Sequence, residues 1–396
     1  MGKVVVTGYG IKAPGVRNKQ EFKDVLEQGI CTQEVLQGIG PNGSDLICGV
    51  IHDRFEKING RNYKHHPRAS RLAVAAADDA IEMAGLRDLR GRRVAILIGS
   101  STSGLAEFEA AAALSTNDQF KKFPFWTAGL VNMHSVSSAV AGHLGIQAQV
   151  FTLSTGCTAS SDALLLGKLL LESGQSDVCI AGGAEAPFSS VVLYSFAKLN
   201  SLPINQGIHQ AGVPFSSATE GFVMSEGAAV LILEREADAI SRDASIFGIV
   251  NRGSANNDGL SINRSDQTGN NMISALRDAV GSIVPTYVNS QALGLNENDT
   301  VESIAHRTLF GTSVPITSIK GMIGHAFGAS GGMQIVSALL SMEYGFIPPT
   351  SKTSGEGYGD LPIVLQTRYC EVRHVAITTH GYGGNNACLL VSKYTS

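Results

Sequence analysis

The sequence predicts an α/β fold in which helices cover both faces of a parallel or mixed sheet. Apolar strand-like runs alternate along the chain with segments that have helical apolar periodicity. The runs at 94–99 and 178–181 are apolar throughout, as expected for strands buried on both faces. The chain has 396 residues, 43% hydrophobic and 16% charged, which is enough for two domains with cores. This alternation is typical of layered α/β proteins.

The first half alternates strands and helices. Strands are expected at 3–7, 94–99, 148–153, 178–181 and 221–234, the last of them in a hairpin. Helices are expected at 19–28, 69–84, 131–144 and from residue 159 to an end at Gly174. Small and apolar residues lie on all sides of 131–144, which predicts a helix in the middle of the molecule. The strand at 148–153 is predicted to be buried.

The second half repeats this order of elements, although no sequence repeat is strong enough to prove duplication. Strands are expected at 245–250, 285–289, 316–318, 372–378 and 387–392, and helices at 270–280, 300–309 and 331–344. We place the two halves at residues 1–243 and 244–396. No low-complexity linker separates them, which predicts a shared interface.

Composition narrows the functional classes. A net charge of −4 and a pI near 6.2 give no basic footprint for nucleic acid, although a local basic patch for an acidic carrier stays open. The six cysteines are scattered without metal spacing, so we expect neither disulfides nor a metal site. The N-terminal apolar run is too short for a secretory signal, and no segment has the length of a membrane span. We therefore expect a cytoplasmic protein.

One cysteine lies where a strand is predicted to turn into a helix, in FTLSTGCTAS (151–160). At that position the helix N-terminus would favour the thiolate of Cys157 and make it nucleophilic. Gly156 permits the sharp turn. The alternative is that Cys157 is only a small buried core residue.

Two glycine-rich segments of the second half offer partners for such a thiol. SIKGMIGHAFGASGG (318–332) contains Lys320 and His325, and TTHGYGGNN (378–386) is predicted to be a loop whose N–H groups approach a ligand. A nucleophilic thiol needs a base and donors for an oxyanion. His325 alone could be a structural histidine, but its pairing with Lys320 favours a functional role.

These segments, together with VNSQALGLNENDTVE (288–302), resemble the four active-site blocks of β-ketoacyl-acyl carrier protein synthases of the elongating type, in the thiolase superfamily. The segments KVVVTGYGI, SDVCIAGGAEAP, EGFVMSEGAAVLILE and NNACLLV also occur in the expected order, so the likeness covers essentially the whole chain. The resemblance implies a thiolase-like fold with two similar βαβαβαββ halves in five layers, α-β-α-β-α.

The resemblance also implies roles for individual residues. Cys157 would accept an acyl chain as a thioester from the phosphopantetheine of a carrier protein or from CoA, with no further cofactor and no metal. The N–H groups of Cys157 and Tyr382 would form the oxyanion hole. His325 would hydrogen-bond the thioester carbonyl of the malonyl group, and Lys320 would tune the network with Glu302. Pairing through the strand before the nucleophile and the helix at 131–144 implies a homodimer, or a heterodimer with a sister ketosynthase.

The chain departs from this family pattern at three places. Gln291 stands where the family has the first histidine of a His-Gly-Thr-Gly-Thr pattern. His380 and Tyr382 replace two phenylalanines of a gate. The segment 213–221, rich in charge in the family, has Glu220 as its only charged residue.

The chemistry of an amide limits what Gln291 can do. Its side chain donates hydrogen bonds but cannot carry a charge or exchange a proton as imidazole does. Acyl transfer onto Cys157 survives this change, whereas decarboxylation of malonyl loses a donor, at a cost of roughly 10²–10³ in rate. The Gln291 amide could occupy the imidazole's place, or the exchange could be purely structural. His380 could replace the missing imidazole, act as a base for another acyl acceptor, or be a loop residue bonded to backbone.

The leading hypothesis is a ketosynthase-like acyltransferase that acts on acyl-carrier-protein thioesters in fatty-acid or polyketide biosynthesis, with decarboxylative condensation altered or impaired. Three alternatives stay open: a fully active condensing synthase, a malonyl-carrier decarboxylase, and a chain-length-factor-like partner without catalysis of its own. The presence of Cys157 and His325 argues against the last.

Overall fold

A ten-stranded mixed sheet runs through the structure and consists of two five-stranded units. The computed structural model describes residues 2–218, 221–262 and 264–395. The strand order is β13-β12-β16-β17-β11-β1-β10-β8-β6-β7, and β1 pairs antiparallel with β11 where the units meet. The first unit contains β1 (Val4–Lys12), β6 (Val94–Gly99), β7 (Gln149–Leu153), β8 (Val178–Glu185) and β10 (Gly227–Arg235). The second contains β11 (Gly248–Asn257), β12 (Tyr287–Asn289), β13 (Ile316–Thr317), β16 (His374–His380) and β17 (Asn385–Ser392).

The two units have the same topology. Counted outward from the junction, each runs through its first, fifth, fourth, second and third strand in chain order. Corresponding pairs also agree in direction, because β6–β7 and β12–β13 are parallel while β8–β10 and β16–β17 are antiparallel. The repetition that the sequence only suggested is therefore present in the strand order.

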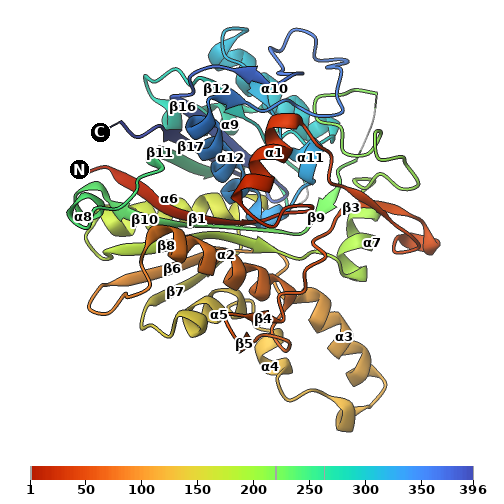
Figure 1. The fold of residues 1–396 in the computed structure, drawn as a ribbon. Coiled ribbons are helices and arrows are strands. Elements are labelled where there is room, and N and C mark those ends of the chain that lie inside the picture. Colours follow the sequence, from red (N-terminus) through yellow and green to blue (C-terminus); the bar gives the residue numbers. More distant parts are fainter. Residues whose placement is uncertain (1, 219–220, 263, 396) are drawn as a thin grey trace.

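Helices cover both faces of each unit and give the five layers α-β-α-β-α (Figure 1). The outer layer of the first unit contains α2 (Arg68–Ala84) and α5 (Ser135–Leu144), and that of the second contains α9 (Asn270–Val280) and α10 (Asn296–Phe310). The central layer consists of α6 (Ala159–Glu172) and α12 (Ser330–Tyr344), which contact each other. A Cβ on Gly331 would lie 2.1 Å from the Ser161 Oγ, so a small residue is required at this crossing. The thiolase-like fold is confirmed.

Two predictions about burial are wrong. The segment 131–144 is not a central helix: α4 (Thr127–Leu130) ends before it, and α5 packs on α2 and β6 in an outer layer with one side exposed. The central position belongs to α12, which is buried from Ser330 to Met342. Strand β7 lies at an edge of the described sheet, where Phe151 is 42% exposed. Residue type alone did not reveal the position of either element in the layers.

Other elements agree with the sequence or add to it. Helices α1 (Lys19–Gln28) and α9 have the predicted bounds. The predicted hairpin at 221–234 is instead two strands with different partners, because β9 (Met224–Ser225) pairs with β3 (Leu46–Gly49) whereas β10 pairs with β1 and β8. Elements that were not predicted are β2 (Glu34–Leu36), β3, β4 (Lys57–Ile58), β5 (Arg61–Asn62), α3 (Leu105–Thr116), α7 (Ser190–Lys198), α8 (Glu236–Ser241), α11 (Lys320–Ile323), β14 (Phe346–Ile347) and β15 (Arg368–Tyr369).

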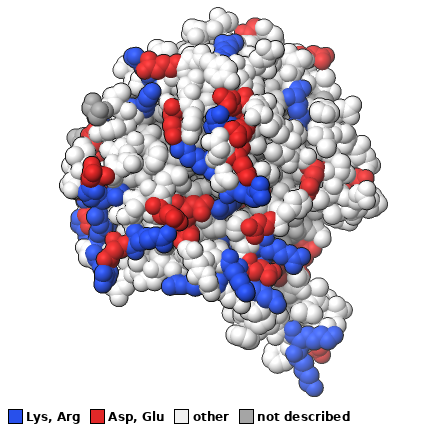
Figure 2. Space-filling model, viewed as in Figure 1, with Lys and Arg blue, Asp and Glu red and all other residues white. Residues whose placement is uncertain are grey.

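Positive and negative side chains alternate over the face shown in Figure 2, and basic residues gather at the tip of the protruding lobe. This lobe carries α3, and the turn after it contains the exposed Lys121 and Lys122. Among the described residues, no helix combines the length and the apolar character needed to cross a bilayer.

Candidate active site

The thiol of Cys157 lies at the turn between β7 and α6, as predicted. A short 3-10 turn (Gly156–Thr158) leads directly into α6, and Gly156 has a φ of +68°, which favours glycine. Cys157 is 8% exposed and lines a cavity of about 350 Å³. The thiol is therefore buried but reachable from this cavity.

His325 from the second half meets this thiol. Its Nε2 lies 3.2 Å from the Cys157 Sγ, and its Nδ1 lies 3.1 Å from the Oγ of Ser330, the first residue of α12. The backbone of His325 is fixed because its N–H donates to the Val223 carbonyl and its carbonyl accepts from the Ser225 N–H. The thiol and the imidazole thus come from equivalent ends of the two central helices.

Burial decides the protonation of this pair. It raises the pKa of Cys157 to about 12, and the charge of Glu185 adds to the effect while that of Lys320 opposes it. Burial also lowers the pKa of His325 well below its ordinary value, in the same direction as the charges of Lys320 and His380. Burial therefore opposes the predicted stabilisation of the thiolate, because desolvation outweighs the effect of the helix N-terminus. The resting pair is a thiol beside a neutral imidazole.

Lys320 lies in α11, fully buried, with its Nζ 3.1 Å from the Gln334 Oε1. Burial lowers its pKa to about 7, while the charges of Glu302 and Cys157 oppose this shift. The described residues show no direct contact between Lys320 and Glu302. The expected coupling of these two residues thus acts through charge across the site.

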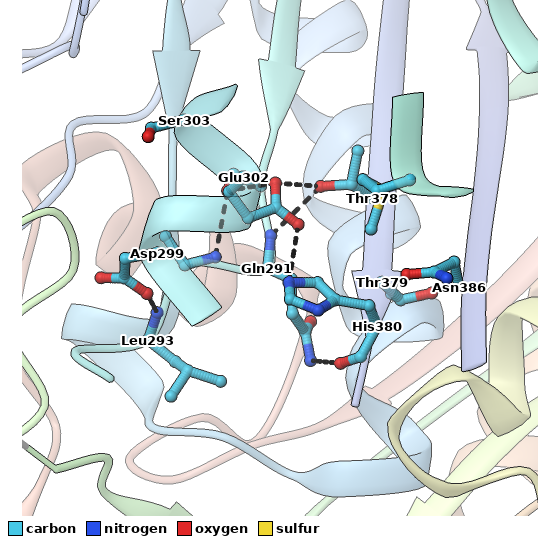
Figure 3. Close-up of polar contacts among 12 residues, drawn as sticks. Gln291, Leu293, Asp299, Glu302, Ser303, Thr378, Thr379, His380 and Asn386 are labelled. Atoms are coloured by element: carbon cyan, nitrogen blue, oxygen red, sulfur yellow. Dashed lines mark hydrogen bonds and ion pairs between the residues drawn. The ribbon is translucent and has the colours of Figure 1, made fainter. Parts of the chain in front are cut away.

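Glu302, on α10, is the centre of a second polar cluster (Figure 3). Its Oε2 accepts hydrogen bonds from the hydroxyls of Ser290 and Thr378, both at 2.7 Å. Its Oε1 lies 3.3 Å from the Nε2 of His380, at ion-pair distance. Burial acts to raise the pKa of Glu302, but His380 and the two hydroxyls hold it below the ordinary value. Glu302 is therefore a carboxylate despite full burial.

Gln291 directs its amide toward the backbone of the neighbouring strand. Its Nε2 donates to the carbonyl of His380 over 3.3 Å, and its backbone N–H donates to the Thr378 Oγ1 over 3.3 Å. The side chain is fully buried, and Gln291 does not belong to the described lining of the cavity. The amide N–H₂ is thus engaged with backbone rather than with the space beside Cys157.

The segment 378–386 is more regular than the predicted loop. Strand β16 extends to His380 and β17 begins at Asn385, so the turn between them is short. A Cβ on Gly381 would lie 2.9 Å from the Cys157 Sγ, which explains the glycine next to the thiol. Tyr382 places its hydroxyl 2.7 Å from the Ser201 Oγ. The role of the Tyr382 N–H as an oxyanion donor stays a prediction, and Glu220 lies outside the described residues.

Three phenylalanines that the sequence did not identify as site residues line the cavity around Cys157, namely Phe196, Phe222 and Phe327. Phe196 contacts the rings of Phe222 and Phe327 edge-to-face at 5.4 and 5.3 Å, and Tyr382 at 5.5 Å. Phe327 has a φ of +37°, an unusual backbone for a bulky residue. Phe196 belongs to α7, which was not predicted, and no local pattern distinguishes such a ring from a core residue.

The chain is similar to one family of proteins along most of its length. Residues 1–239 match the description "Beta-ketoacyl synthase, N-terminal domain", and residues 247–354 match "Beta-ketoacyl synthase, C-terminal domain". A similar curated protein is "Actinorhodin polyketide putative beta-ketoacyl synthase 1" of Streptomyces coelicolor, 27% identical over 98% of this chain and 88% of that protein. Another is "3-oxoacyl-[acyl-carrier-protein] synthase 2" of Synechocystis, 27% identical over 99% of this chain and 98% of the relative.

Solved structures share the fold. "The ishigamide ketosynthase/chain length factor" superimposes with a TM-score of 0.90 at 24% identity, covering 100% of both chains. A type II polyketide ketosynthase solved with its acyl-carrier protein has a TM-score of 0.88 at 25% identity, again covering 100% of both chains. These likenesses agree with the strand order and the layers described above.

Proposed function

This chain belongs to the β-ketoacyl synthase family, and we propose that it transfers acyl groups from carrier-protein or CoA thioesters onto Cys157 in polyketide or fatty-acid biosynthesis. The contact of 3.2 Å between the Cys157 Sγ and the His325 Nε2, at the wall of an aromatic cavity, supports this proposal most directly. The relatives named above are a polyketide beta-ketoacyl synthase and a 3-oxoacyl-[acyl-carrier-protein] synthase. No resident cofactor is proposed, since the substrate arrives on a phosphopantetheine arm.

The transfer follows from the neutral thiol–imidazole pair. As the Sγ attacks the thioester carbonyl, its proton passes to the Nε2 of His325. The carbonyl oxygen becomes an oxyanion, for which we assign the N–H groups of Cys157 and Tyr382 as donors. When the carbonyl reforms, the old C–S bond breaks and the pantetheine sulfur takes the proton from His325. Coupling the two proton movements avoids a free thiolate in a cavity where burial disfavours charge.

Decarboxylative condensation is altered in this proposal because Gln291 is not available at the reacting atoms. Its N–H₂ donates to the His380 carbonyl, and its side chain lacks the proton exchange of imidazole. A synthase with one enolate donor missing is expected to lose roughly 10²–10³ in rate unless another group takes its place.

We further propose a carrier protein and a second ketosynthase-type chain as partners, and a cytoplasmic location. Among the structural neighbours, one ketosynthase was solved with its acyl-carrier protein and another, from Xenorhabdus doucetiae, with its chain length factor. In this chain β7 lies at the sheet edge with Phe151 exposed, and such an edge can pair with another strand. Light scattering of wild type and Phe151→Glu tests this: wild type should be dimeric, alone or with a sister chain, and the variant should be monomeric.

Intact-mass measurement tests acyl transfer. The protein is incubated with a panel of acyl groups on CoA and on a phosphopantetheinylated carrier protein, beside Cys157→Ala and a known ketosynthase. Wild type should gain the mass of one acyl group, and Cys157→Ala should not. If the known ketosynthase is loaded and wild type stays unmodified throughout the panel, the proposal is wrong, and a partner without catalysis becomes the better description.

A further inference from the structure

The gate residue His380 faces the same cavity as Cys157 and His325. It is the last residue of β16, and its side chain is 1% exposed. Figure 3 shows its ring next to the carboxylate of Glu302, while its backbone carbonyl receives the amide of Gln291. His380 is thus a second imidazole in the lining of the reaction cavity.

Within the part of the chain that the structure describes, neither nitrogen of this ring has an aligned hydrogen bond, and only Nε2 has a charged neighbour. The His380 Nε2 lies 3.3 Å from the Glu302 Oε1, a contact that is close but not aligned as a hydrogen bond. Among the described residues, the His380 Nδ1 has no hydrogen-bond partner although it is buried. A buried polar atom without a partner needs an explanation, and a ligand that completes it is one. An N–H at Nδ1 is a hydrogen-bond donor, and the Glu302 carboxylate lies beside the other nitrogen of the ring.

We propose that His380, held by Glu302, donates the hydrogen bond to the malonyl enolate that Gln291 cannot supply. This inference rests on the proposed acyl transfer to Cys157. Gln291 becomes a positioning residue, since its Nε2 fixes the backbone carbonyl of His380. Two side-chain exchanges, one shortly after β12 and one at the end of β16, then keep an imidazole in the cavity while changing the segment from which it comes.

His380 assists the decarboxylation of the malonyl thioester and the condensation that follows it. In the malonyl thioester, the bond between C2 and the carboxylate breaks, and carbon dioxide leaves. The electron pair moves into an enolate, whose oxygen accepts hydrogen bonds from His325 and His380. The enolate C2 then attacks the thioester carbonyl of acyl-Cys157, and the C–S bond breaks. The Cys157 sulfur leaves with the electron pair and takes up one proton from solvent water, which restores the thiol.

The test separates decarboxylation from acyl transfer in the same samples. Each protein is first loaded with the best acyl donor found by intact mass, then given [¹⁴C]malonyl-CoA labelled in its free carboxylate, and released carbon dioxide is counted. His380→Phe should lower release about 10²–10³-fold while acylation of Cys157 changes less than about tenfold. The double exchange Gln291→His, His380→Phe should recover most of the release. His374→Phe, on the same strand but outside the described cavity lining, is the control and should match wild type in both readouts.

Each possible result supports or contradicts the role proposed for His380. If wild type is acylated but releases no carbon dioxide above a blank without protein, or if His380→Phe releases it as fast as wild type, the role of His380 is wrong and the acyl transfer stands. If wild type is not acylated, the proposed function itself fails. If His380→Phe loses acylation too, Glu302→Gln replaces it as the deciding variant, because it removes the charge and keeps the shape. About tenfold slower release with acylation intact supports the inference, and unchanged release overturns it.

Discussion

Two buried histidines face one cavity, but their surroundings differ. His325 lies against the Cys157 thiol and Ser330, with Lys320 as its nearest cationic influence. His380 lies against the Glu302 carboxylate. The first environment favours a neutral ring that can accept a proton, and the second places a negative charge beside the ring. Environments that differ in this way divide acid and base work between two chemically identical side chains.

The two surroundings also differ in how they follow the family pattern. Cys157 and His325 lie at the ends of α6 and α12, where the duplicated fold brings two helix N-termini together. The cluster of Glu302, His380 and Gln291 lies near the ends of β12 and β16, and it contains two of the positions at which the resemblance implies a departure from the family. The thiol side is therefore expected to behave as in the family, whereas the Glu302 side should show properties of its own.

The largest effect should follow from removing the base on the thiol side. His325→Ala leaves the Cys157 proton without an acceptor at 3.2 Å, so the rate of acylation should fall by about 10²–10⁴. A time course of intact mass measures this rate. His306→Ala, which removes a buried histidine outside the described cavity lining, is the control. An equal loss in both variants would show that the effect is general destabilisation and not proton transfer.

Removing the buried Glu302 carboxylate should chiefly lower the stability of the protein. Glu302→Ala leaves His380 buried without its carboxylate and deprives Ser290 and Thr378 of their acceptor. The free energy of unfolding should fall by about 3–5 kcal/mol, as for other broken buried pairs. Urea unfolding checks this value. Glu236→Ala, which breaks the exposed contact with Lys3, should cost less than about 1 kcal/mol, and equal losses would mean that the buried cluster is not special.

Local signals made much of this architecture predictable. The bounds of α1 follow from its apolar period, from the Asn18 side chain that accepts the Glu21 N–H, and from Gly29 at a φ of +66°. The order of strands and helices in both halves could be predicted in the same way. The position of a helix in an outer or a central layer could not be predicted in this way. Both α5 and α12 consist largely of small and apolar residues, and they differ in how completely other segments bury them.

Within the site, the motifs and the family resemblance predicted which residues meet but not how each is oriented or charged. The contact between Cys157 and His325 was expected from the motifs, whereas the raised pKa of the thiol depends on burial by distant segments. The direction of the Gln291 amide depends on the position of β16, and the ring of Phe196 comes from an unpredicted helix. These properties arise from tertiary packing, so no local pattern encodes them.

The dependence of the free energy of unfolding on pH tests the electrostatic environment of Lys320, which lies on the thiol side of the site. Burial lowers the pKa of Lys320 to about 7, from an ordinary value of 10.5. Between these values the unfolded chain binds a proton that the native chain does not, so the free energy of unfolding rises with pH. From pH 7 to pH 9, wild type should gain about 2 kcal/mol relative to Lys320→Met. Urea unfolding at both pH values tests this, with Lys3→Met as an exposed control that should follow wild type.

The smallest expected effect concerns Tyr382, which the family resemblance places in the same gate as His380. Tyr382 is linked to Ser201 through their hydroxyls, 2.7 Å apart, whereas His380 is linked to the buried Glu302. Tyr382→Phe removes the hydroxyl but keeps the ring that packs on Phe196, so the free energy of unfolding should fall by only about 0.5–1.5 kcal/mol. Ser201→Ala should give a similar loss, and the double variant should lose less than the sum, because both changes break one contact. Additive losses would show that the hydroxyls act independently, and the polar anchoring of the gate would then come from the His380 side alone.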